Sequence, residues 1–189
     1  MSRIGMAFAA IALAALVSGC GDTPHEPTGP HSAPSDARST HNEQDLTFAT
    51  DMIAHHTQAI DMAKLVPSRS TDPKMLKLAG SVEQAQTPEI EKMREWLSEW
   101  GAPTAGHGEA HPSMPGMMTS EELDALRALT GADFDRRWLE MMIRHHQGAI
   151  DMAEVELEMG HSDVAKALAQ QIIDSQRAEM TQMQELLQA

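Results

Sequence analysis

Apolar residues recur every three or four positions along most of the chain, a spacing that is typical of amphipathic helices. Proline, glycine and a Thr-Ser-Glu-Glu capping sequence divide this pattern into separate segments. The predicted helices span residues 42–66, 72–100, 119–129, 132–159 and 162–188. Pro88 lies inside the second segment and is expected to kink it. The polar–apolar alternation of strands does not occur, so the sequence predicts an all-α fold.

The pattern contains an internal duplication with an offset of 90 residues. Met-Ile-Ala-His-His at 52–56 returns as Met-Ile-Arg-His-His at 142–146, and Ala-Ile-Asp-Met-Ala at 59–63 returns at 149–153. The chain is therefore two copies of one helix pair, and packing the copies together predicts an up-down four-helix bundle. Equivalent residues should face each other near an internal two-fold axis. The expected parts of residues 42–188 are copy one (42–100), a linker (101–119) and copy two (120–188).

The N-terminal segment indicates export. Residues 1–19 have the form of a signal peptide, with an apolar run too short to span a bilayer. The run ends at Cys20 in a sequence similar to the bacterial lipobox, in which cysteine is lipidated. Cys20 is the only cysteine, so no intrachain disulfide can form, and we expect it to be a membrane anchor; a soluble secreted protein is the alternative. Residues 20–41, rich in proline and small polar residues, predict a disordered tether holding an extracytoplasmic domain.

Charge and composition exclude several function classes. The formal net charge is −14, which argues against nucleic acid as a partner and against docking flat on anionic lipid. No thiol or serine lies in a recognisable catalytic motif, so we do not expect an enzyme. The chain also has 15 methionines and no tyrosine, a bias that suggests a chemical role for sulfur.

The repeated segments concentrate residues that bind soft and borderline metals. At 100° per residue, His56 and His146 face the centre of the apolar stripe, while His55 and His145 lie at its edge. Imidazole suits copper and zinc, and thioether sulfur adds a preference for Cu(I). The candidate metal ligands are Met52, His55, His56, Met62, Met142, His145, His146 and Met152.

The second helix of each pair places polar residues in the middle of its buried face. They are Gln86 and Glu89 in copy one and Gln176 and Glu179 in copy two. A buried carboxylate is costly unless it is paired or bound to a cation, so these residues are candidates to orient the imidazoles or to join them as ligands. Counted from the turns, Glu179 should lie within about one helical turn of His146 in depth along the bundle axis. His56 should lie closer in depth along the bundle axis to Gln86 than to Glu89.

Two interpretations of these residues remain open. In one, histidine and Glu or Gln form hydrogen-bonded pairs that set the register of the bundle, and the methionines fill space. In the other, the whole set binds a metal. A di-iron oxidase site is disfavoured, because methionine stands where such bundles carry a hard carboxylate ligand.

The linker is a second candidate site for Cu(I), which accepts low coordination numbers. Its histidines and methionines are His107, His111, Met114, Met117 and Met118. The alternative is a loop in which the last two methionines fold back onto the bundle.

The motif around 142–153, together with Met117-Met118-Thr-Ser-Glu-Glu-Leu and Phe134-Asp135, resembles a bacterial exported family known as domain of unknown function 305. The resemblance covers about residues 42–188. It implies a ferritin-like bundle, an extracytoplasmic location and, for some members, copper or silver binding linked to metal tolerance. Asp51 stands where copy two has Met141, which breaks the symmetry of the motif. The expected function is a lipoprotein that sequesters or delivers copper, with an envelope copper-handling protein as partner. A lipoprotein interaction module without metal and a ferritin-like metalloenzyme are the alternatives.

Overall fold

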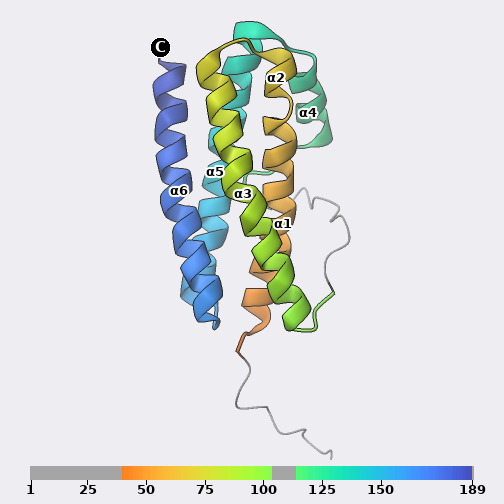
Figure 1. Cartoon of the computed structure of the whole chain (residues 1–189), viewed down its shortest axis with the longest axis vertical. Helices are drawn as coiled ribbons and strands as arrows, with labels where there is room; N and C mark the ends of the chain where they lie inside the picture. The colour runs from red at the N-terminus through yellow and green to blue at the C-terminus, as the bar shows by residue number, and fades with distance from the viewer. Residues whose placement is uncertain (1–39, 104–113, 189) are drawn as a thin grey trace, which may run out of the picture. The chain divides into compact units, whose positions relative to one another are not determined.

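The computed structural model describes residues 40–103 and 114–188. All of them lie in the second of two units into which the chain divides, residues 38–189. This part of the chain contains six α-helices and no strand. They are α1 (Glu43–Ala63), α2 (Val66–Arg69), α3 (Pro73–Glu99), α4 (Ser120–Arg127), α5 (Gly131–Met159) and α6 (Asp163–Leu187). The four long helices lie side by side (Figure 1), which confirms the predicted all-α bundle.

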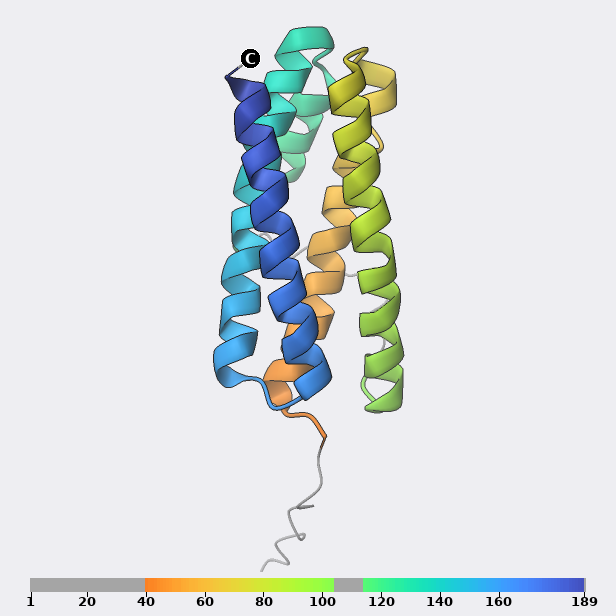
Figure 2. The same ribbon diagram turned by 60° about the vertical axis from the view of Figure 1, so that its left-hand side comes forward.

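The duplication is visible in how the helices pack. Helix α1 packs along α3 and α5 packs along α6, so each copy forms one helix hairpin. The two hairpins meet chiefly where α1 contacts α5. Figure 2 shows the short helix α2 at the end of the bundle where α3 and α5 begin. None of the described helices is long and apolar enough to cross a membrane.

The capping signals place most helix starts where the sequence predicted them. Asn42 and Thr119 form capping boxes at the starts of α1 and α4. Helix α3 begins at Pro73 and continues through Pro88. The first helix ends at Ala63 rather than at residue 66, and Pro67 then lies in the first turn of α2, where its missing N–H costs nothing.

At the opposite end, a carboxyl pair ties α1 to the turn between α5 and α6. The Asp45 carboxylate accepts hydrogen bonds from the backbone N–H groups of His161 (3.1 Å) and Ser162 (2.8 Å). Glu156 is buried beside it, and burial together with the neighbouring Asp45 raises the pKa of Glu156 to about 8. Glu156 is therefore mostly protonated at neutral pH.

The apolar core forms two clusters along the bundle, and a polar layer separates them. One cluster is built around Phe48, Ile90 and Ile172, and the other around Met75 and Trp138. On every long helix, the polar positions fall between those that contribute to the two clusters. We call this set the histidine layer; its members are His55, His56, Gln86, Glu89, His145, His146, Gln176 and Glu179, all of them buried.

Candidate metal centre

The histidine layer brings together the four candidate imidazoles and the four residues expected to orient them. Two histidines come from α1 and two from α5, and all four have an exposed fraction of 0%. The amides and carboxylates come from α3 and α6. The sequence placed His55 and His145 at the edge of the apolar stripe, and the structure buries them fully.

Each copy contains one histidine–glutamate pair with the same geometry. The distance from Nε2 to Oε2 is 2.7 Å in His56–Glu89 and also 2.7 Å in His146–Glu179. A carboxylate oxygen accepts, so Nε2 of each ring donates. Both Nδ1 atoms are buried and make no hydrogen bond in the described structure.

The prediction for His146 and Glu179 is confirmed, but the prediction that His56 lies closer to Gln86 was wrong. His56 pairs with Glu89, one turn further along α3. The reason is that α2 extends the end of the bundle beyond the end of α1. Helix α3 consequently starts further out, and its residues reach the level of His56 later than a count from a tight turn suggests.

The centre of the layer is a pair of equivalent histidines, one from each copy. The ring centroids of His55 and His145 are 3.8 Å apart and their planes are tilted by 42°. This contact confirms that equivalent residues of the two copies meet. Burial is the main cause, and the neighbouring His56 the second, that lowers the pKa of His55 to about 3. Burial is also the main cause, and the neighbouring His55 the second, that holds the pKa of His145 well below its usual range. Both rings are therefore neutral.

The central pair also has ring nitrogens that make no hydrogen bond in the described structure. Nδ1 of His55 and both ring nitrogens of His145 are buried without a hydrogen-bond partner in the described structure. Neutral imidazole with a free lone pair is the form that binds metals. Buried polar atoms without partners are costly, and such groups in a native fold indicate a functional role or an additional ligand.

Sequence analysis named Met114, Met117 and Met118 as part of a loop but did not place this segment over the central pair. Residues Met114–Met118, which we call the strap, lie against α1 and α5 just before α4. Nε2 of His55 donates to the carbonyl oxygen of Pro115 at 3.0 Å. The strap closes the edge of the stripe, where the sequence placed His55 and His145. This bond also makes the two central histidines unequal.

One difference between the copies could have revealed the strap. Gln58 of copy one corresponds to Gly148 of copy two. Nε2 of Gln58 donates to the carbonyl oxygen of Met118 at 2.9 Å, and Oε1 of Gln58 accepts from the backbone N–H of Met118 at 2.7 Å. A Cβ on Gly148 would overlap the Pro115 carbonyl, so only glycine lets the strap approach α5.

The candidate methionines flank the histidine layer on both sides. Met52 and the partly exposed Met152 belong to one apolar cluster, and Met62 and Met142 belong to the other. Met141 is buried in the core, whereas its counterpart Asp51 lines a surface groove. The described residues contain no group of three or more His, Cys, Asp or Glu side chains arranged to hold a metal ion. A metal at the central pair would consequently need thioether ligands or a small rearrangement.

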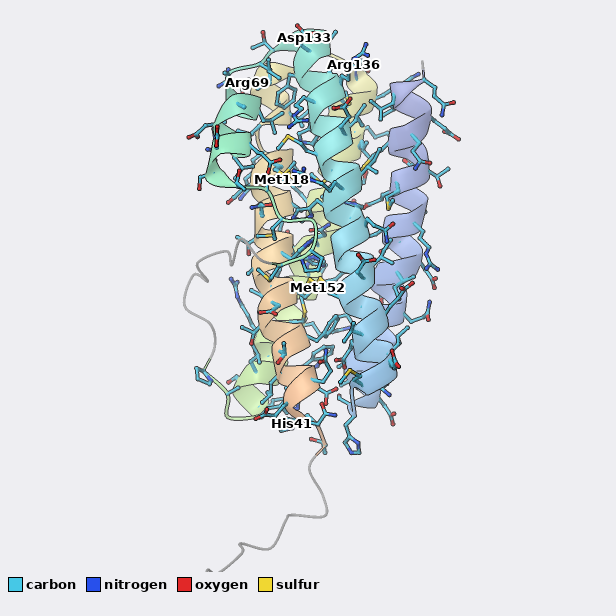
Figure 3. The ribbon with its side chains drawn as sticks, turned by 180° about the vertical axis from the view of Figure 1, so that it is seen from behind. His41, Arg69, Met118, Asp133, Arg136 and Met152 are labelled. Atoms are coloured by element: carbon cyan, nitrogen blue, oxygen red, sulfur yellow. The ribbon has the colours of Figure 1, made fainter. Side chains whose placement is uncertain are left out.

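The linker site is only partly described. His107 and His111 lie outside the described residues, as does Cys20. Met117 and Met118 are buried against the bundle, in agreement with the alternative in which they fold back. An Arg144 guanidinium N–H points at the sulfur of Met118, and a positive charge there disfavours a cation at that sulfur. Figure 3 shows Met118 and Met152 on the face that the strap crosses.

Comparison with known proteins adds a family to this geometry. The model of a family described as domain of unknown function (DUF305) matches residues 45–187. No curated protein sequence matches the chain.

Several solved structures are similar. A DUF305 protein from Streptomyces coelicolor, described as secreted, is 33% identical with a TM-score of 0.71, over 76% of this chain and 91% of that chain. A DUF305 fragment from Deinococcus radiodurans is 32% identical with a TM-score of 0.71, over 77% of this chain and 96% of that chain. CopM in its Cu(I)-bound form is 34% identical with a TM-score of 0.65, over 76% of this chain and 95% of that chain. CopM also has solved Cu(II)-bound and silver-bound forms.

Proposed function

This chain belongs to the DUF305 family, and we propose that it is an exported, lipid-anchored protein of the cell envelope that binds copper or a similar soft metal. The observation that carries the proposal is the central pair, in which His55 and His145 are neutral, in contact and equipped with unpartnered nitrogens. Their donor atoms come from both copies, so a metal held there would join the two hairpins.

The chemistry of the surrounding residues fits such a metal. Imidazole nitrogen together with thioether sulfur favours Cu(I), and silver or zinc could take the same kind of ligands. His56 and His146 are oriented by their glutamates, an arrangement that fixes the tautomer and raises the basicity of the free nitrogen. We propose the four histidines as ligands, with sulfur ligands drawn from Met52, Met62, Met142 and Met152.

The relatives support location and metal class. CopM, 34% identical, has been solved with Cu(I) bound, and the Streptomyces coelicolor relative is described as secreted. Lipidation of Cys20 would hold the domain at a membrane, where it would sequester copper or pass it to another copper-handling protein. We propose no catalytic turnover.

The alternative is an interaction module without metal, and one observation favours it. The two histidine–glutamate pairs satisfy each other at 2.7 Å and could serve only to fix the register of the bundle. The central pair separates the two proposals, because a register role would not require donor atoms without partners.

Competition with a chromogenic Cu(I) chelator tests the metal proposal. We expect the tag-free chain to remove Cu(I) from the chelator, and the double variant His55→Ala/His145→Ala to lose the tighter component. His161→Ala is the matched control, because that side chain is exposed. Circular dichroism checks that the helices of the double variant remain. Equal affinity of the double variant and the unmodified chain would reject the central pair as the site.

The anchor needs a separate test. We expect Cys20→Ala to move the protein from the membrane fraction to the soluble fraction. Continued membrane retention of this variant would reject lipidation at Cys20.

A further inference from the structure

The central histidines are enclosed on every side. His55 and His145 have no exposed surface, and the strap lies over the line where α1 meets α5. The carbonyl of Pro115 holds Nε2 of His55 at 3.0 Å. Any ion that reaches the pair from this face must pass the position that the strap occupies.

A groove borders the strap at Pro115. It has a volume of about 250 Å³ and runs between α1 and α5, with Pro115 as part of its lining. Asp51 and Asp151 bring carboxylates to it, and Met152 brings a sulfur. Negative charge at an opening raises the local concentration of cations. Pro115 therefore contacts both this acidic groove and the buried ring of His55.

The strap is held by the buried side chains of Met117 and Met118 and by hydrogen bonds to neighbouring side chains. Gln58 makes two hydrogen bonds to the backbone of Met118, and these bonds are buried. Gly148 of α5 and Gly116 of the strap allow their backbones to approach closely, and Gly116 has a φ of 75°, which favours glycine. A short segment held in this way can open locally without unfolding the four long helices.

From this arrangement we propose that the strap is a gate, held shut by Gln58, that controls the access of metal to His55 and His145 from the groove. The inference rests on the proposed metal-binding function. Gln58 acts as a positioning residue: its amide would not contact the ion, and it would act only through the strap. Opening the strap would also release Nε2 of His55 from Pro115.

Chemical modification of histidine by diethylpyrocarbonate measures access without any metal. Peptide mass spectrometry gives the modification rate at each histidine. In the unmodified chain we expect His55 and His145 to react far more slowly than the exposed His161. Gln58→Ala should raise the rates at His55 and His145 about tenfold or more and leave His161 unchanged. Gln170→Ala is the matched control, because that exposed amide binds only Asp174 on its own helix among the described contacts.

A second variant opens the strap by a different mechanism. Gly148→Ala keeps α5 a good helix but puts a methyl group where the Pro115 carbonyl lies. Gly80→Ala is its control, since nothing lies within 4 Å of a Cβ there. We expect Gly148→Ala to speed modification of the central pair and Gly80→Ala not to. The gate is overturned if both strap variants leave His55 and His145 as protected as before, or if His56 and His146 become exposed to the same degree.

Metal uptake then separates the gate from the function. Stopped-flow mixing with Cu(I) should show faster uptake by Gln58→Ala and Gly148→Ala, with the same final stoichiometry as the unmodified chain. If no form of the chain binds Cu(I), the proposed function fails while the modification rates still decide the gate. If all forms bind Cu(I) at one rate and modification rates are also equal, the gate fails and the function stands.

Discussion

The two copies of the helix pair are alike in one part of the histidine layer and different in another. The pairs His56–Glu89 and His146–Glu179 have the same atoms and the same distance. The central histidines differ, because only His55 binds the strap. The difference lies where the chain has one strap for two copies, so one copy supplies Gln58 to hold it and the other supplies Gly148 to make room.

This comparison separates, within one layer, the histidines that pair with a glutamate from those that do not. The glutamate-paired histidines satisfy their Nε2 atoms inside the bundle, and so stabilise it while orienting Nδ1. In the central pair, His55 has one hydrogen bond, to the strap, and neither ring nitrogen of His145 has a partner in the described structure. Each buried nitrogen without a hydrogen bond costs about 1–3 kcal/mol. A bound soft metal would offset that cost. The duplication thus supplies two supporting pairs and one shared centre.

The largest expected effect tests whether the two pairs are equivalent. His56→Ala and His146→Ala each leave a buried carboxylate without its partner and should lower the free energy of unfolding by about 3 kcal/mol. Urea denaturation of the metal-free chain measures both. Gln170→Ala should change it by less than about 0.5 kcal/mol. A severe effect at one pair and none at the other would break the equivalence.

The pH dependence tests the central pair. The folded chain keeps His55 neutral down to a pKa of about 3, whereas the unfolded chain binds a proton near the usual value of 6.5. Between these values the unfolded state binds more protons, so stability falls as the pH is lowered from 6.5. Relative to His55→Asn, the unmodified chain should lose about 1.6 kcal/mol between pH 6.5 and pH 5.

Glu156 acts in the opposite direction. Its pKa is raised to about 8, so its contribution is present at low pH and is lost as the pH rises from about 4.5 to 8. Because the unmodified chain and His55→Asn both carry Glu156, its contribution cancels in the comparison. A difference between the two proteins that stays constant with pH would show that His55 is not held neutral.

Two glycine substitutions sharpen the contrast between the copies at the strap. Gly80→Ala should raise the free energy of unfolding by about 0.5–1 kcal/mol, because alanine favours helix and the site is open. Gly148→Ala should lower it by about 1–2 kcal/mol despite the same helix preference, because the strap must move. Thermal unfolding monitored by circular dichroism gives both signs. Stabilisation by both would mean that the strap is not packed tightly on α5.

The smallest effect concerns a surface difference between the copies. The ion pair Arg177–Glu154 of copy two has side chains exposed by 59% and 55%, and copy one has Thr87 and Lys64 at the equivalent positions. Arg177→Ala should change the free energy of unfolding by less than about 0.5 kcal/mol. A larger loss would show that the copies diverged in their stabilising surface contacts as well as at the strap.

Much of the fold could be predicted because helical periodicity, capping residues and the offset of 90 residues all point to the same bundle. The same offset predicted that equivalent histidines meet, and His55 and His145 do. The partner of His56 could not be predicted, because it depends on how far α2 extends the turn. The strap could not be predicted from periodicity either, since Met114–Met118 carries none and its position is set by tertiary contacts with Gln58 and Gly148.

X-ray absorption spectroscopy at the copper edge of the Cu(I)-loaded chain tests the central claim most directly. We predict a first coordination sphere that contains both imidazole nitrogen and thioether sulfur, and a clearly weaker imidazole contribution in His55→Ala/His145→Ala, which retains only His56 and His146. A spectrum that contains only sulfur, or that does not change in this double variant, would contradict the account.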